Sequence, residues 1–142
     1  MTLFADQGRD ALRATWREAW RKWRERIPMQ ALEAQIADVI AAHPEYQPLL
    51  QSEASVQQDF PGQDGHGNPF LHMGLHLALR EQLATNRPPG IVAIHRRLIA
   101  SLASEHAAEH RMMEALAGVL WDAQRAGRDA DDAVYLERLR QL

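Results

Sequence analysis

The chain has 142 residues, of which 46% are hydrophobic and 25% are charged, and its formal net charge is −3. This length suits a single helical domain over residues 1–142 with a buried core, and the composition is ordinary for a globular protein. The small negative charge gives no support to binding of nucleic acid or of a membrane surface. Because the chain has no cysteine, disulfides, thiolate metal sites and cysteine nucleophiles are excluded. No stretch is typical of a signal peptide or of an apolar membrane span, so we expect a cytoplasmic protein.

Apolar residues at spacings of three and four predict helices along the first third of the chain. The first helix is expected over residues 8–26. The second begins at Pro28 and stops before Pro44, because proline cannot continue a helix. Residues 44–67 are rich in Pro, Gly, Gln and Asp, and a connection of this length in a compact domain is expected to be partly helical or functional.

Two more long helices are predicted after this connection. Asn68 suits an N-cap and Pro69 suits a first helical position, so a third helix is expected over residues 69–85. A fourth helix is expected over residues 90–126, with Gly127 as its C-terminal cap.

A short last helix completes the predicted fold. Asp129 is suited to cap it, over residues 130–142. No alternation typical of strands occurs in the sequence. The predicted fold is therefore all-α: an antiparallel four-helix bundle with a short fifth C-terminal helix and a long, partly helical connection at 44–67.

The first helix carries tryptophans on one face and arginines on the other. The tryptophans are Trp16, Trp20 and Trp23, and the arginines are Arg17, Arg21 and Arg24. We expect the indoles to pack against the core, with at least one of them available at an interface. A homo-oligomer or a protein partner bound through this helix is therefore expected, whereas nucleic acid and membranes are not.

Two pairs of histidines have a spacing of four residues. His72 and His76 lie on the third predicted helix, and His106 and His110 lie on the fourth. Both pairs fall on apolar faces or at their edge. Glu109 lies on the same stripe, where a carboxylate is costly unless it is paired, hydrogen-bonded or bound to a metal. We expect most of these side chains to be buried.

A hairpin at residues 87–89 would place residue 72 level with residues 103–104, and so bring His72 close to His106. His95 would then lie about 16 Å from His106 along the axis of one continuous helix, and it is expected to be a hydrogen-bonded core residue outside the cluster. The candidate metal ligands are therefore His72, His76, His106, Glu109 and His110.

Two further histidines have simpler interpretations. His43 lies at the C-terminal end of the second helix, where an imidazole would interact favourably with the helix dipole. A role as an additional metal ligand is the alternative for His43. His66, in the stretch GQDGHGN, is expected to be solvated.

Imidazole and carboxylate ligands suit zinc, iron, manganese or nickel, and the ligand set alone does not choose among these cofactors. If Glu109 is not a ligand, burial would raise the pKa of its carboxyl group and make it a general base. Two classes of function stay open. One is a metal-dependent enzyme or carrier, and the other is a helical interaction module whose core histidines are structural. No serine-nucleophile or glycine-rich nucleotide-binding motif is present.

Several stretches carry a resemblance to a known family. They are EAWRKWRE, IADVIAAHPEY, NPFLHMGLHLALREQLATNRPPGI and EHRMMEALAGVLWDAQR. Over nearly its whole length the chain resembles a family of small proteobacterial proteins catalogued as domain of unknown function 1841. The resemblance implies a bacterial, cytoplasmic protein and assigns no role to any residue.

A fainter analogy is to hemerythrin-like bundles, which bind two irons with H-x-x-x-H and H-x-x-x-E patterns. His72–His76 fits the first pattern and His110–Glu114 fits the second, so the analogy adds Glu114 as a weaker candidate ligand. Glu114 points away from the apolar stripe, and bridging carboxylates are not evident in the sequence.

Overall fold

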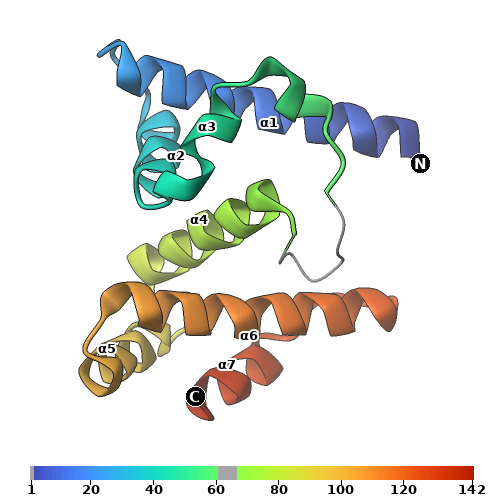
Figure 1. Cartoon of the computed structure of the whole chain (residues 1–142). Coiled ribbons are helices and arrows are strands. Elements are labelled where there is room, and N and C mark those ends of the chain that lie inside the picture. Colours follow the sequence, from blue (N-terminus) through green and yellow to red (C-terminus); the bar gives the residue numbers. More distant parts are fainter. Residues whose placement is uncertain (1, 61–66) are drawn as a thin grey trace. The chain divides into compact units, whose positions relative to one another are not determined.

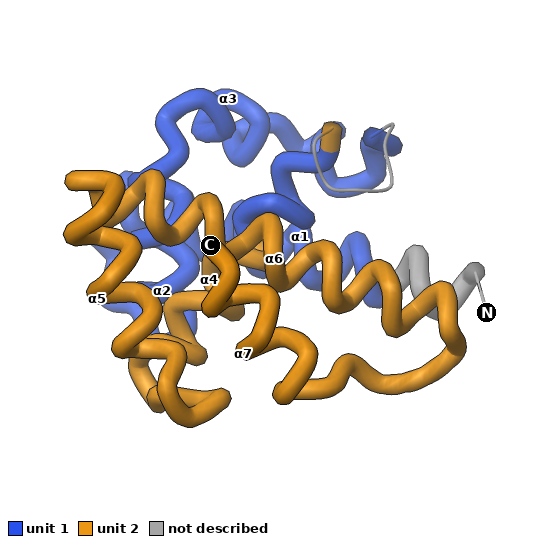
Figure 2. Tube along the Cα trace, turned by 90° about the horizontal axis from the view of Figure 1, so that it is seen from below, with its two compact units in different colours: residues 1–61, 68–73 blue, residues 62–67, 74–142 orange. Residues whose placement is uncertain are grey.

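The computed structural model describes residues 2–60 and 67–142, and its regular secondary structure over these residues is entirely helical (Figure 1). It contains seven α-helices and two short 3-10 helices, with no strand among the described residues. The predicted all-α class is therefore confirmed. The chain divides into two compact units: residues 1–61 with 68–73, and residues 62–67 with 74–142 (Figure 2). We call these the first unit and the second unit.

The first unit is built on α1 (Thr2–Arg24) and α2 (Ala31–Ala41), which pack against each other. Their shared core is apolar because both helices repeat apolar residues at helical spacing. The buried side chains include Trp16, Ala19, Trp20, Ile36, Val39 and Ile40. Helix α2 begins three residues after the predicted Pro28. Gln30 precedes its first turn, and the Gln30 N–H donates to Glu33 Oε1 at 2.9 Å.

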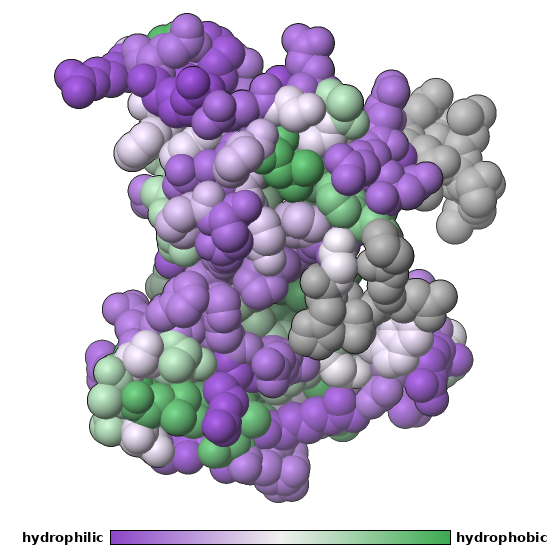
Figure 3. Space-filling model, in the orientation of Figure 1, coloured by the Kyte–Doolittle hydropathy of each residue, from purple (hydrophilic) through white to green (hydrophobic). Residues whose placement is uncertain are grey.

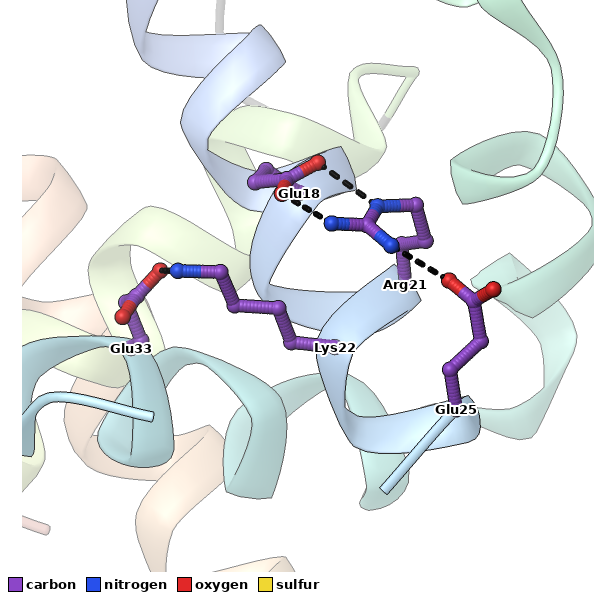
Figure 4. Close-up of polar contacts among 5 residues, drawn as sticks. All are labelled: Glu18, Arg21, Lys22, Glu25 and Glu33. Atoms are coloured by element: carbon purple, nitrogen blue, oxygen red, sulfur yellow. Dashed lines mark hydrogen bonds and ion pairs between the residues drawn. The ribbon is translucent and has the colours of Figure 1, made fainter. Parts of the chain in front are cut away.

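Ion pairs join the end of α1 to its surroundings (Figure 4). Arg21 lies between Glu18 of the same helix and Glu25, which directly follows the end of α1, with both N–O distances at 2.5 Å. Lys22 reaches across to Glu33 of α2 at 2.6 Å. The two pairs of Arg21 are exposed and contribute little to stability, whereas Lys22 and Glu33 are more enclosed and fix the pairing of the two helices.

The connection after α2 is partly helical, as predicted. It contains η1 (Pro44–Tyr46), α3 (Gln47–Leu50) and η2 (Glu53–Gln57). Arg13 of α1 is buried beneath it and donates from one nitrogen to the carbonyls of Val56 and Gln58, at 3.2 and 2.7 Å. The same guanidinium lies over two aromatic rings, those of Phe60 and Phe70. Arg13 therefore holds the connection against α1.

Helix α4 (Pro69–Thr85) has the bounds that the sequence predicted. The side chain of Asn68 accepts a hydrogen bond from the N–H of Leu71 at 3.2 Å, which confirms Asn68 as the capping residue. The division between the two units falls within this helix, after Met73.

The second unit contains the rest of α4 with α5 (Ile91–Leu102), α6 (Glu105–Arg125) and α7 (Asp132–Arg140). Its core is drawn from all four helices and includes Leu79, Ile91, Leu98, Met112, Leu116, Tyr135 and Leu139. Tyr135 of α7 donates its hydroxyl hydrogen to Gln82 Oε1 of α4 at 2.7 Å. Burial raises the pKa of this tyrosine well above its usual value.

The prediction of one continuous helix over residues 90–126 is wrong, because α5 and α6 are separate helices. Ala103 has φ 54°, a left-handed conformation that ends α5. Ser104 then caps α6, since its hydroxyl oxygen accepts a hydrogen bond from the N–H of Ala107 at 3.0 Å. The chain therefore turns at Ala103 and Ser104, and α5 packs against α6.

Two smaller predictions also need correction. The last helix is capped by Asp131 rather than Asp129, with the Asp131 side chain accepting from the N–H of Ala133 at 2.8 Å. The first helix begins at Thr2, six residues before the predicted start. Among the helices that the structure describes, none has an apolar stretch long enough to cross a bilayer.

The three tryptophans of α1 differ in exposure, as the sequence predicted. Trp16 and Trp20 are buried, whereas Trp23 exposes 46% of its surface. The rings of Trp20 and Trp23 are stacked, with centroids 4.8 Å apart. On the face drawn in Figure 3, hydrophilic residues predominate and hydrophobic ones form small patches.

Candidate metal centre

The structure divides the predicted ligands between the two units. His43 and His72 belong to the first unit, whereas His76, His106, Glu109 and His110 belong to the second. The prediction that His72 pairs with His106 rested on a continuous fourth helix. That helix is broken at residues 103–104, so the register on which the pairing relied does not exist.

In the first unit, three aromatic side chains lie together. The ring of His72 meets those of His43 and Tyr46 edge to face, with centroids 5.0 and 5.8 Å away. His43 is fully buried, and its Nδ1–H donates to the carbonyl of Val39 at 2.7 Å. Val39 lies in the last turn of α2, so His43 satisfies one of the terminal carbonyls of that helix. This matches the capping interpretation of His43.

In the second unit, His76 of α4 is joined to Glu109 of α6. His76 Nε2 lies 2.7 Å from Glu109 Oε1, and both side chains are buried. Arg80, one turn further along α4, donates from Nε to the same oxygen at 3.4 Å. The second oxygen of Glu109, Oε2, faces in another direction and lies 3.6 Å from His95 Nε2.

These neighbours determine the ionisation of Glu109. Burial by itself raises the pKa of the carboxyl group. The hydrogen bond and charge of His76, together with Arg80, have the larger and opposite effect, so the pKa is lowered to about 2. Glu109 is therefore a carboxylate at neutral pH. The prediction that burial would raise its pKa and make it a general base is wrong, because the cationic and hydrogen-bonding partners outweigh burial.

The ionised carboxylate fixes the state of His76. Because both oxygens of a carboxylate can only accept, the hydrogen between His76 Nε2 and Glu109 Oε1 must belong to Nε2. In the neutral imidazole the lone pair is then on Nδ1, the nitrogen by which such a ring binds a metal. A histidine held by a carboxylate in this way is the usual outer shell of a metal-binding histidine.

His106 and His110 lie one turn apart on α6. Their ring centroids are 4.0 Å apart, and those of His76 lie 5.7 Å from His110 and 6.4 Å from His106. His76 is buried and His110 is half-buried, but His106 is exposed. The expectation that His106 is buried is therefore wrong, because it lies near the start of α6, where the helix breaks away from α5 rather than continuing through the core.

His95 was predicted to lie far from the cluster, and this too is wrong. The turn at Ala103 and Ser104 brings α5 back along α6, so that His95 reaches Glu109. Glu105, which precedes Glu109 by one helical turn, joins them. One nitrogen of His95 and one oxygen from each glutamate all lie within 4.8 Å of one another. One partly buried histidine, one buried glutamate and one exposed glutamate of the second unit could therefore hold a metal ion.

Sequence reasoning missed His95 and Glu105 for one reason, the undetected helix break. The signal was present, because Ser104 followed by Glu105 is typical of a helix N-terminus. Of the remaining candidates, Glu114 is exposed on α6. His66 lies outside the described residues.

The geometry thus defines a small all-helical protein with a histidine and carboxylate cluster in its second unit. The chain belongs to the family described as domain of unknown function (DUF1841), whose model matches residues 8–141. No curated protein and no solved structure matches the chain, so the analogy to hemerythrin-like bundles has no support.

Proposed function

We propose that the second unit binds a transition metal ion through the imidazole nitrogens of His76, His106 and His110. The observation that carries this proposal is the buried 2.7 Å hydrogen bond between His76 and Glu109. This hydrogen bond keeps a hydrogen on Nε2, so that when the ring is neutral, as a metal ligand must be, its lone pair is on Nδ1.

The spacing of the rings supports a shared ion. A histidine nitrogen lies about 2.0–2.1 Å from a bound zinc ion, so each ring centroid lies about 3.2 Å from it. Two such rings at a tetrahedral angle have centroids about 5 Å apart. The three observed distances, from 4.0 to 6.4 Å, bracket this value. Binding would require the exposed His106 ring to rotate towards the other two rings.

The proposed site would be open on one side. Three histidines leave a position of a tetrahedral ion for water or a substrate, and His106 faces solvent. Nitrogen-rich ligands suit zinc or nickel better than manganese. When bound, such an ion would lower the pKa of a water molecule on it or polarise a substrate oxygen. We therefore propose a metal-binding protein with a solvent-accessible centre, and we assign it no reaction.

The test uses protein purified without a histidine tag. Elemental analysis should find zinc or nickel, and a chelator should lower the melting temperature, because a ligand at about 1,000 times its dissociation constant adds about 4 kcal/mol of stability. The His106→Ala, His110→Ala double variant should lose both the metal and the chelator effect. His66→Ala serves as the control histidine variant and should keep both. Wild-type protein that is indifferent to chelator, zinc and nickel would contradict the proposal.

The second candidate is an interaction module without a metal. It is supported by Trp23, whose large ring is 46% exposed, and by the exposure of Leu12, Ile27 and Leu32 in the same unit. We propose a second copy of this chain as the partner. Sedimentation over a range of concentrations would show self-association of wild type that Trp23→Ala weakens. A monomer at all concentrations would rule out this candidate.

A further inference from the structure

We infer that the second unit holds another cation site, formed by His95, Glu105 and Glu109, which takes a manganese-like divalent ion. This site goes beyond the proposed histidine centre, because it uses the opposite oxygen of Glu109. Oε1 accepts from His76 and Arg80, whereas Oε2 faces His95 at 3.6 Å. One carboxylate thus lies between two clusters.

The local fold explains why these residues meet. Glu105 and Glu109 are four residues apart on α6, so their side chains share one face of the helix. Glu105 lies directly after the capping residue Ser104, where the chain has just turned away from α5. His95 comes from the neighbouring helix α5 and reaches this face from the other side. A continuous helix would have kept His95 away from both glutamates.

The distances are on the scale of a metal site. Ligand atoms about 2.1 Å from an ion lie about 3.0 Å apart in octahedral geometry and about 3.4 Å apart in tetrahedral geometry. The His95 to Glu109 distance is 3.6 Å, and all three ligand atoms lie within 4.8 Å of one another. To bind one ion, His95 Nε2 and Glu109 Oε2 would have to approach each other by a few tenths of an ångström. Because Glu105 is exposed, its side chain can rotate to supply the rest.

His95 gives independent support for a ligand here. Its Nε2 atom is buried, yet it makes no hydrogen bond, since 3.6 Å to Glu109 exceeds hydrogen-bond length. A buried ring nitrogen without a hydrogen bond is uncommon and calls for an explanation. A cation between this nitrogen and Glu109 Oε2 would give His95 Nε2 the partner that it lacks.

Charge and ligand type select the ion. Two carboxylates would neutralise a divalent cation. Two oxygen ligands with one nitrogen, open to solvent through Glu105, suit manganese or ferrous iron better than copper or a closed zinc site. Three protein ligands leave the other octahedral positions to water or to an oxygen-bearing substrate.

The experiment is a titration with Mn²⁺ alone, in which the electron paramagnetic resonance signal measures the concentration of the free ion. Wild type should bind one Mn²⁺ per chain. Glu105→Gln and His95→Gln should each lower the affinity at least about tenfold, because each removes a direct ligand. Glu114→Gln, an exposed glutamate of the same helix, should bind Mn²⁺ as wild type does. Circular dichroism verifies that each variant is folded.

The His106→Ala, His110→Ala double variant separates this site from the histidine centre. It should keep its affinity for Mn²⁺, while Glu105→Gln should keep the zinc or nickel of the histidine centre. Absence of Mn²⁺ binding to folded wild type would overturn the inference. So would equal affinity of wild type and Glu105→Gln, an equal loss in Glu114→Gln, or loss of Mn²⁺ binding in the His106, His110 double variant.

Discussion

His76 and Glu109 are 33 positions apart in the chain, and their side chains meet at 2.7 Å in the interior of the second unit. His76 exposes none of its surface and Glu109 exposes 4%. The pair joins α4 to α6, and it leaves a hydrogen on one ring nitrogen and a full negative charge on the carboxylate. Both proposed metal sites depend on this pair, because the histidine centre uses His76 and the second cation site uses Glu109.

The pair makes stability depend on pH in acid. The pKa of Glu109 lies at about 2 in the folded chain, against an ordinary value of 4.5. Because the folded pKa is the lower one, the stabilisation is fully present above pH 4.5 and is lost as the pH falls from 4.5 towards 2. We expect wild type to lose on the order of 2 kcal/mol more than Glu109→Gln over this range.

Urea unfolding at a series of pH values measures this difference. Glu114→Gln, which changes an exposed carboxyl group on the same helix, should follow the wild-type pH dependence. If the free energy of unfolding had the same pH dependence in wild type and Glu109→Gln, the partners of Glu109 would not lower its pKa.

The turn between α5 and α6 predicts opposite effects for one substitution at two positions. Ala103 adopts φ 54°, where an L-residue with a Cβ is strained and glycine is not. Ala103→Gly should therefore raise the free energy of unfolding by about 1 kcal/mol. Ala100→Gly, three residues earlier and inside α5, should lower it by about 1 kcal/mol.

Ser104→Ala should also destabilise, by about 1 kcal/mol, since it removes the acceptor for the N–H of Ala107. Chemical denaturation compares all three variants. If both glycine variants destabilised equally, Ala103 would be inside a regular helix and the turn would not exist.

The tryptophans of α1 predict a contrast within one helix. Trp16 exposes 3% of its surface and Trp23 exposes 46%. Trp16→Ala should lower the free energy of unfolding by about 3–5 kcal/mol, because it empties a large part of the core of the first unit. Trp23→Ala should cost about 1 kcal/mol, which is the contribution of its stacking on Trp20.

Acrylamide quenching provides the second readout for this pair. Trp23→Ala should remove the most accessible part of the emission, whereas the ring of Trp16 should be protected in the folded protein. Equal quenching of wild type and Trp23→Ala would contradict the assigned exposure.

Periodicity in the sequence predicted the helical class because the apolar stripes are long and regular. The start of α4 was predicted correctly for a local reason, since Asn68 and Pro69 combine a cap with a residue suited to the first turn. Such signals depend only on neighbouring residues. They require no knowledge of how the helices pack.

The turn at Ala103 was missed because alanine is the best helix former and gives no sign of a left-handed conformation. That one error propagated into the site. It placed His95 too far from the cluster, brought His72 to His106, and buried His106 in a helix interior. Side chains far apart in the chain can be grouped only when every intervening turn is known, so the ligand sets could not be derived from spacing alone.

Arg13 has a consequence for how the first unit opens. A single guanidinium nitrogen holds the carbonyls of Val56 and Gln58, and the same group lies over Phe60. Withdrawal of Arg13 would therefore release both carbonyls at once. We therefore expect residues 56–60 to detach from α1 together, as a small cooperative unit, when Arg13 withdraws.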